Sequence, residues 1–468
     1  MQKVGRILGL VIGLTSAASL AAGTDGSWSA CTMPARLSPD PAGKTNYVAT
    51  WGTNPGSCPS WSGYTFRTVD AAVKCAKGKD TIMVRGGSYS PFGIANTWPS
   101  DRILITNYPG ENPVIDGWYS VGDYQAIIWL WNVSNIAIQG LTIQNTGVPD
   151  DEHGGYGVKV DSSTSVKFYY NTIKNTARHG IVMDGHQHEV VGNEIANTVM
   201  RNQWKSSNWW DAGFANAGTR QQWGFKFIGN LVHDAWGECV DIIQMSGATV
   251  QQNKIYNCLS GNLYVTNSEN VTVNRNWIFA NTDAYNRPGY WYRSIAIGIA
   301  NEGATGGFTT KNIRVTNNLV ERLGQAVRYW RSHTGGSIWD MYANVYVGFN
   351  TFAYTQTWPI RFDAPDGTPQ GWNRIRQNIV INTSGWAWYS NDNTSNWEVA
   401  KNWQYSSTQW NTPGITDGNG GWAGAYKLQS YSTLRWVVPP NSEWDMPSDD
   451  FNCNARNPND WGAAGASF

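Results

Sequence analysis

The hydrophobic and polar positions of this chain follow one short pattern that recurs through its middle part. Hydrophobic positions precede an Asn, and one variable residue then separates that Asn from a bulky hydrophobic residue. The recurring residues are Asn171, Asn193, Asn230, Asn253, Asn276, Asn318, Asn350 and Asn378. The spacing is 22 residues from Asn171 to Asn193 and 23 residues from Asn230 to Asn253. A spacing near 22 with longer steps elsewhere predicts a solenoid of stacked β-coils that carry loop insertions.

The recurring Asn has a structural explanation that requires no substrate. Asn tolerates left-handed backbone torsions, and its side-chain amide can form hydrogen bonds at a bend. Equivalent Asn residues of successive coils can therefore stack as an internal ladder. We interpret them as scaffold.

The pattern changes ahead of the repeat. Residues 66–76 have the pattern of a short amphipathic helix, and residues 81–84 that of a strand. A helix at this place would cover the first coil, whose open end exposes unpaired backbone groups and hydrophobic core. The predicted organisation is a signal peptide at 1–22, an N-terminal segment and cap at 23–120, β-helix coils at 121–391 and a C-terminal cover segment at 392–468.

Composition and charge limit the classes of binding partner and the cellular compartment that we expect for this protein. Lys plus Arg and Asp plus Glu number 34 each, so no global field attracts nucleic acid or a membrane. Lys3 and Arg6 precede an apolar stretch and several small residues, which predicts a secretory signal. Six Cys residues suit an oxidising compartment, and we expect the pairs Cys58–Cys75 and Cys239–Cys258. The prediction is a secreted, monomeric protein.

Four segments carry a resemblance to a known group. Residues 47–56, 66–76, 78–89 and 108–117 together resemble the N-terminal part of secreted right-handed parallel β-helix proteins of the pectate-lyase-like superfamily, nearest to the group that contains family-nine pectate lyases. The resemblance implies an all-β fold, a right-handed parallel β-helix with an N-terminal capping helix and long loop insertions. It is specific for fold and not for reaction, since this scaffold hosts lyases, hydrolases, epimerases and binding proteins.

Within the predicted coils, one strand type carries outward residues of unusual chemistry. Side chains alternate across a strand, so the aliphatic residues face the core and the residues between them face outward. The outward residues form a predicted column with neighbours about 4.8 Å apart: Lys159, Asp241, Tyr264, Arg328 and Arg361. A row of charged and aromatic groups on a flat sheet suits an extended polymer.

Two long insertions, at 197–223 and 280–310, are rich in aromatic and basic residues. Aromatic planes beside hydrogen-bonding groups suit sugar rings, which have apolar C–H faces and hydroxyl edges. The predicted partner is therefore an extracellular polysaccharide. The predicted substrate-binding residues are Tyr264, Arg361, Arg331, Lys205, Arg220, Trp209, Trp210 and Trp291.

The preferred reaction is β-elimination on a uronic-acid polymer, in which a base removes the proton beside the carboxyl group and a cation stabilises the developing charge. The resemblance implies Ca²⁺ as a possible cofactor, with Asp184, Glu238 and Asp241 as ligands and Lys159 or Arg328 as base. His179 at the edge of the same region is a further catalytic candidate. The sequence lacks the clustered Asp pair followed by a strand Lys that family-nine enzymes carry.

Two alternatives remain open. Glu238 and Asp241 can be the general acid and base of a glycoside hydrolase, because three extended residues separate them by at most about 10 Å. A non-catalytic glycan-binding or surface protein is the third hypothesis. The segment with His186 and His188 follows a turn signal at Asp184-Gly185, and we interpret it as a solvated bend.

Overall fold

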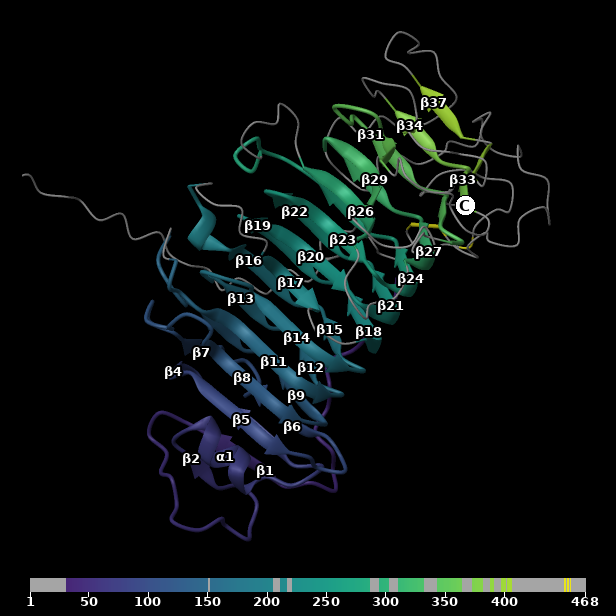
Figure 1. Cartoon of the computed structure of the whole chain (residues 1–468). Helices are drawn as coiled ribbons and strands as arrows, with labels where there is room; N and C mark the ends of the chain where they lie inside the picture. The colour runs from purple at the N-terminus through teal and green to yellow at the C-terminus, as the bar shows by residue number, and fades with distance from the viewer. Residues whose placement is uncertain are drawn as a thin grey trace, which may run out of the picture.

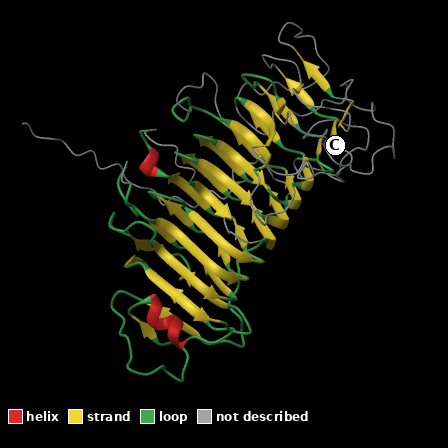
Figure 2. Cartoon of the chain, in the orientation of Figure 1, coloured by secondary structure: helices red, strands yellow, loops and turns green. Residues whose placement is uncertain are grey.

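The computed structural model describes residues 31–149, 152–204, 211–216, 221–286, 294–302, 310–331, 343–363, 373–381, 388–390, 397–400, 402–405, 450–451, 453 and 455. Over these residues the chain winds into an elongated stack of coils, with the short helix α1 (Val69–Cys75) at its N-terminal end (Figure 1). Nearly all regular structure is strand (Figure 2). Strands of successive coils pair in parallel. The predicted parallel β-helix is therefore confirmed.

Three sheets run the length of the stack, and each full coil contributes one strand to each of them. Sheet A contains β1 (Thr45–Val48), β2 (Thr65–Phe66), β3 (Thr81–Val84), β6 (Ile103–Asn107), β9 (Ile136–Gln139), β12 (Lys167–Tyr169), β15 (Glu189–Val191), β18 (Gln222–Ile228), β21 (Met245–Gln251), β24 (Glu269–Asn274), β27 (Lys311–Thr316), β30 (Tyr346–Gly348), β33 (Asn373–Arg376) and β36 (Trp397–Ala400). Sheet B contains β4 (Gly87–Tyr89), β7 (Pro113–Asp116), β10 (Thr142–Gln144), β13 (Thr172–Lys174), β16 (Glu194–Thr198), β19 (Leu231–Ala235), β22 (Lys254–Cys258), β25 (Trp277–Phe279), β28 (Leu319–Glu321), β31 (Thr351–Ala353), β34 (Ile379–Ile381) and β37 (Trp403–Tyr405).

Sheet C carries the outward column predicted from the sequence. It contains β5 (Phe92–Thr97), β8 (Ala126–Val133), β11 (Tyr156–Thr164), β14 (Ile181–His186), β17 (Ala212–Asn216), β20 (Glu238–Ile243), β23 (Gly261–Thr266), β26 (Ile295–Asn301), β29 (Gln325–Arg331), β32 (Ile360–Asp363) and β35 (Trp388–Ser390). A short 3-10 helix, η1 (Met200–Asn202), lies between β16 and β17.

The core is one continuous column of aliphatic and aromatic side chains enclosed by the three sheets. Helix α1 covers its N-terminal end with Val69, Ala72 and Val73, all buried. Thr68 caps the helix by accepting a hydrogen bond from the Ala71 backbone N–H at 3.3 Å. The helix is shorter than the predicted 66–76, whereas β3 matches the predicted strand. Among the described helices, none has the length and apolar character needed to cross a bilayer.

The predicted Asn ladder is present and continuous from Asn171 to Asn402. At each step the backbone N–H and the side-chain amide both donate to the carboxamide oxygen of the next Asn, as from Asn230 to Asn253 at 2.8 and 3.1 Å. The same amide also donates to a main-chain carbonyl, as from Asn230 to Val190 at 2.9 Å. The ladder residues from Asn171 to Asn378 are buried, and these bonds satisfy polar groups that would otherwise be costly inside the core.

The reason given for Asn at these positions was partly wrong. The ladder Asn does not adopt left-handed torsions; the residue immediately before it does. Tyr170 has φ 53°, Gly192 has φ 65° and Gln252 has φ 56°. The bend between sheets A and B is therefore made by a variable residue, and Asn is selected for its two-sided hydrogen bonding.

The coils extend beyond the predicted range 121–391 at both ends. Strands from β1 onward already belong to the sheets, and β36 and β37 follow residue 391. The early coils were missed because the ladder begins only at Asn171. Much of the predicted cover segment 392–468, and the predicted signal at 1–22, lie outside the described residues.

Three disulfides and an N-terminal segment cross-link parts of the chain that are distant in sequence. Both expected pairs, Cys58–Cys75 and Cys239–Cys258, are present. The third disulfide joins Cys31 to Cys453, 422 residues apart. Residues 31–38, which we call the strap, run along the outside of sheets A and B: the Leu37 N–H donates to Gln139 at 2.7 Å, and the Tyr170 hydroxyl donates to the Pro34 carbonyl.

Candidate active site

The register of sheet C places the predicted column together. From β8 to β32 the paired residues are, in order, Trp129, Lys159, Val182, Ala215, Asp241, Tyr264, Gly298, Arg328 and Arg361. All five predicted members therefore lie in one row, and the geometric prediction is confirmed. The row also contains Val182, Ala215 and Gly298, which the sequence reasoning did not include.

These intervening residues decide which groups can act together. Lys159 lies three strands from Asp241 on one side and Arg328 three strands away on the other, about 14 Å each at 4.8 Å per strand. Lys159 and Arg328 are consequently about 29 Å apart and cannot serve the same sugar. The middle of the row belongs to Asp241 and Tyr264.

A pair of carboxyl groups occupies this middle position. Asp241 is 2 % exposed, and its side chain shares a hydrogen bond with the half-buried Glu238 of the same strand. Burial, and then the negative charge of Glu238, raise the pKa of Asp241 well above its ordinary value. The pair therefore retains one proton at a pH where separate carboxyl groups would both be ionised. This contact also means that the two groups do not face each other across a substrate, as acid and base on opposite sides would.

The sequence reasoning missed Glu302 and Trp330, which lie near the carboxyl pair and Tyr264. Glu302 directly follows β26 and is exposed; its carboxylate accepts a hydrogen bond from the Trp330 indole N–H at 2.8 Å. The Trp330 ring stacks on Tyr264 with centroids 5.3 Å apart. Burial and the nearby Glu302 carboxylate raise the pKa of Tyr264, which keeps its hydroxyl protonated. Glu302 contributes to the raised pKa of Asp241 as well, so it lies close enough to interact with the pair.

A buried ionic network borders the same region at the edge of sheet C. Asp211, just before β17, forms ion pairs with Arg178 at 3.5 Å, with His179 at 3.0 Å and with Arg201. The Ala212 backbone N–H donates to His179 Nδ1 at 2.8 Å, so the other ring nitrogen, Nε2, carries the proton directed at Asp211. Both nitrogens of His179 are thus engaged. This geometry gives His179 a positioning role and does not support the predicted catalytic one.

Replacing Asp211 by Asn is expected to destabilise the fold by about 3–5 kcal/mol, because Arg178 and Arg201 would keep buried charges without their shared counter-charge. The free energy of unfolding, measured with guanidinium at neutral pH, tests this. Asp161→Asn is the matched control, since Asp161 pairs with Lys159 at a more exposed place and should change stability by less than about 1 kcal/mol. Equal stability of the two variants would contradict the assignment.

The same network predicts an acid transition. Although burial alone would raise it, the hydrogen bond from His179 and the charges of Arg201 and Arg178 lower the pKa of Asp211 from 3.8 to about 2. A lowered pKa means that the ionised form stabilises the fold, fully so above the ordinary value. That contribution is lost as the pH falls from about 4 toward 2.

The two ends of the row offer binding groups. At one end Trp129 and Trp131 are 40 % and 49 % exposed, and the Lys159 ammonium lies 4.8 Å from the Trp129 ring. Lys159 also pairs with Asp161 at 3.3 Å, and that carboxylate accepts from the Trp129 indole at 2.7 Å. A cation held by a carboxylate is suited to binding more than to acting as a base.

At the other end, Arg328 and Arg361 are direct neighbours in the register. Their guanidinium groups lie 5.6 Å from the Trp330 ring and 5.7 Å from the Trp358 ring, respectively. Two adjacent guanidinium groups suit carboxylates, which they can bind in a bidentate manner.

The predicted calcium ligands are not brought together. Asp184 belongs to β14, two strands from β20, which carries Glu238 and Asp241. Within the described ranges, no three His, Cys, Asp or Glu side chains are arranged to hold a metal ion. Strand β17 lies between β14 and β20, and the sequence reasoning did not count this strand.

Several predicted substrate-binding residues cannot be placed. Lys205, Trp209, Trp210, Arg220 and Trp291 lie outside the described residues, and only the backbone of Arg331 is described, at the end of β29.

The His186–His188 segment is the predicted bend, with exposed Gln187 at φ 58° between β14 and β15, but it is solvated only in part. His188 is buried, and its Nδ1 accepts from the Val166 N–H at 3.2 Å. Burial lowers the pKa of His188 to about 4, so it is neutral at physiological pH. His186 stacks closely on the Trp223 ring, which is itself half exposed.

Residues 126–352 match the family model for the right handed beta helix region. This part of the chain is a right-handed β-helix. The match covers the coils from β8 to β31 and therefore includes the Asp241 region. The resemblance to β-helix proteins of the pectate-lyase-like superfamily is confirmed for the fold.

A curated relative matches a short part of the chain. The uncharacterized protein YwoF of Bacillus subtilis is 34% identical over 105 residues, which are 21% of this chain and 22% of that protein. The chain thus spans about a fifth of the length of the curated relative it matches.

Three solved structures with similar folds differ in function. A GH136 lacto-N-biosidase from Eubacterium ramulus has a TM-score of 0.56 at 11% identity, covering 77% of this chain and 68% of that one. The pectate lyase Pel9A has a TM-score of 0.50 at 11% identity, covering 91% and 97%. PfbA, a surface adhesin of Streptococcus pneumoniae, has a TM-score of 0.50 at 11% identity, covering 75% and 88%. At these identities the similarity establishes the fold alone.

Proposed function

We propose that this protein is a secreted carbohydrate-active enzyme that hydrolyses an acidic polysaccharide at the Glu238–Asp241 pair. The observation that carries the proposal is the raised pKa of buried Asp241, in hydrogen-bond contact with half-buried Glu238 in the middle of the outward row. A carboxyl pair that keeps a proton above the pH range in which ordinary carboxyl groups ionise has the chemistry that a general acid requires. Three disulfides support secretion.

In the proposed reaction, the carboxyl pair acts as the general acid and Glu302 acts as the general base. Glu238, the member of the pair that reaches the surface, delivers the shared proton to the glycosidic oxygen as the bond between that oxygen and the anomeric carbon breaks. Glu302 takes a proton from a water molecule, whose oxygen forms the new bond to the anomeric carbon. The proton on Glu302 then returns to the pair through solvent. Asp241 acts as a positioning residue that keeps Glu238 supplied with a proton.

Hydrolysis ranks above β-elimination because of where the cations lie. A lyase needs a base and a positive group at one sugar. In the described part of the row, Lys159 and Arg328 each lie about 14 Å from Asp241. Arg178 and Arg201 are buried and already paired with Asp211. The carboxyl groups at the centre therefore favour acid–base hydrolysis.

The residues at the two ends of the row support a proposal for the substrate class. Trp129 and Trp131 offer exposed aromatic faces about 19 Å from Asp241, and Arg328 and Arg361 offer adjacent guanidinium groups on the other side. A glycan that reaches both ends must be longer than a disaccharide. Carboxylates along it would bind the two Arg residues, so we expect a uronic-acid-containing polymer.

The test is incubation with polygalacturonate, alginate and a neutral glucan, each with and without a chelator. The expected product has new reducing ends and no ultraviolet-absorbing double bond, and its amount does not change with the chelator. An unsaturated product would reject hydrolysis, and loss of activity with the chelator would require a metal that the described carboxylates do not explain.

Asp241→Asn should change the pH profile in a characteristic way. Without its partner, Glu238 becomes an ordinary carboxylate at neutral pH, and we expect the rate there to fall about 10²-fold or more. Activity should return as the pH falls toward about 4, where an isolated Glu is protonated. The measurement is kcat/KM against pH for both proteins. A uniform loss at every pH would show that Asp241 does not act by holding the proton.

Two other functions have specific support. Pectate lyase Pel9A shares the fold over most of both chains, and Lys159, Arg328 and Arg361 supply the positive groups that an acidic substrate needs. PfbA, an adhesin, has the same fold, which keeps a non-catalytic glycan-binding role as a further alternative. The incubation separates all three, because a binding protein would release no product.

A further inference from the structure

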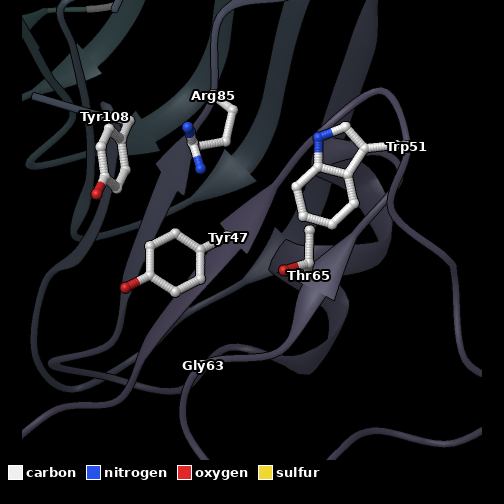
Figure 3. Close-up of a pocket in the computed structure, with 6 residues that line it drawn as sticks. All are labelled: Tyr47, Trp51, Gly63, Thr65, Arg85 and Tyr108. Atoms are coloured by element: carbon white, nitrogen blue, oxygen red, sulfur yellow. The ribbon is translucent and has the colours of Figure 1, made fainter. Parts of the chain in front are cut away.

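A pocket lies at the N-terminal end of the stack, on a different sheet from the candidate active site. Its cavity measures about 220 Å³ and is lined by Tyr47, Trp51, Gly63, Thr65, Arg85 and Tyr108 (Figure 3). Tyr47 and Thr65 are paired residues of β1 and β2 in sheet A, and Arg85 and Tyr108 follow β3 and β6. The candidate active site belongs to sheet C, so a ligand here would occupy a separate surface.

The lining combines aromatic planes with free polar atoms. The Tyr47 and Tyr108 rings are tilted with centroids 6.1 Å apart, and Trp51 is 71 % exposed. Figure 3 shows the Arg85 guanidinium between the rings of Tyr108 and Trp51 in this view. Within the described residues, the Tyr47 and Tyr108 hydroxyls, the Trp51 indole N–H and the Thr65 hydroxyl have no hydrogen-bond partner. They are therefore available to a ligand.

The charge of the pocket is balanced. Arg85 binds Glu111 in a bidentate manner, with its Nε 2.9 Å and its Nη2 2.6 Å from Oε1. Glu111 also accepts from the Gly86 N–H, which fixes the carboxylate. The Arg85 guanidinium lies 4.2 Å from the Tyr108 ring. The remaining guanidinium nitrogen, Nη1, can still donate, but the site has no net charge to attract a phosphate or another strong anion.

The pocket is held in shape before any ligand arrives. The loop that carries Trp51 and Gly63 contains Cys58, whose disulfide to Cys75 anchors it to the end of α1. The Gly63 N–H donates to the Thr45 carbonyl at 2.7 Å. Side chains on paired strands and on an anchored loop lose little freedom on binding, which favours affinity.

We propose that this pocket binds one pyranose ring of a polysaccharide, as an anchoring site separate from the place of cleavage. Aromatic planes accept the apolar C–H face of the ring, and the hydroxyls, the indole N–H and Arg85 Nη1 bond its hydroxyl edge. The volume lies below the range of 300–1,000 Å³ that is usual for ligand sites, which suits a single ring. The site does not depend on the proposed hydrolysis.

The experiment is a microarray of plant, algal and bacterial polysaccharides probed with the Glu238→Gln protein, which should not cleave them. A second probe adds Trp51→Ala. We expect a set of bound glycans whose signal falls roughly tenfold with Trp51→Ala, because an exposed stacking platform is lost. Tyr108→Phe keeps the ring and removes one hydroxyl, and should weaken the same set to a smaller degree.

Trp98→Ala is the matched control, since Trp98 is 60 % exposed and does not line the pocket. Trp129→Ala, on the active-site face, identifies glycans held by the row. Unchanged binding with Trp51→Ala, the same loss with Trp98→Ala, or no bound glycan at all would each overturn the proposal. Because catalysis is absent from this assay, its outcome is independent of whether the protein proves to be a hydrolase.

Discussion

Glu238→Gln is expected to lower the rate of glycan cleavage by about 10²- to 10⁴-fold at every pH. Gln has nearly the shape of Glu but cannot deliver a proton, so the step at the glycosidic oxygen loses its acid. Asp241 cannot replace it, because Asp241 is only 2 % exposed and does not reach a substrate on the surface. The measurement is kcat/KM for polygalacturonate or the best substrate found, from acid to neutral pH.

The control for this variant is Glu269→Gln, the same chemical change in sheet A. Glu269 pairs with Lys311 at 3.0 Å and takes no part in the row, so its replacement should leave the rate unchanged. The contrast with Asp241→Asn is informative as well. That variant should recover at low pH and Glu238→Gln should not, whereas recovery of both would place the acid on another residue.

Replacing Cys31 and Cys453 together by Ser is expected to lower the free energy of unfolding by about 6 kcal/mol, the chain-entropy value for a loop of this length. The disulfide connects residues 422 positions apart and joins the strap to the C-terminal segment that follows the last strand. Without it the unfolded chain gains much more freedom than the folded one. Denaturant unfolding under oxidising conditions, so that the other disulfides persist, gives the value.

The matched control is the double Ser variant of Cys239 and Cys258, which are 19 residues apart. The same entropy relation predicts a loss of only about 3 kcal/mol for a loop of that size. The Cys31–Cys453 variant could lose no more free energy of unfolding than the control. In that case the disulfide does not restrain the unfolded chain, and the strap is held by its non-covalent contacts instead.

The fold could be predicted because successive coils of the ladder repeat the same sequence feature, an Asn at the bend between two strands. Asn at the bend between sheets A and B is recognisable in the sequence, and alternation within the strands then fixed which residues face outward. Both steps use only short-range periodicity, so Lys159, Asp241, Tyr264, Arg328 and Arg361 were correctly placed in one row. Loop insertions between coils did not disturb this register.

The site could be predicted only in part, because proximity along the row depends on how many coils separate two residues. Val182, Ala215 and Gly298 are ordinary small residues that gave no signal, yet they separate the predicted base from the carboxyl pair. Glu302 lies just beyond the end of β26, where alternation stops. The burial that raises the pKa of Asp241 is a property of packing in three dimensions and has no local pattern.

The Asn ladder has an evolutionary consequence. Each carboxamide accepts from one side and donates to the other, as Asn253 does between Asn230 and Asn276. An interior coil therefore offers the same bonds that it requires, and a copy of it inserted beside the original would find every partner already in place. The gene can lengthen or shorten the scaffold by one turn at a time without redesigning its interior, which leaves the outer faces free to diversify.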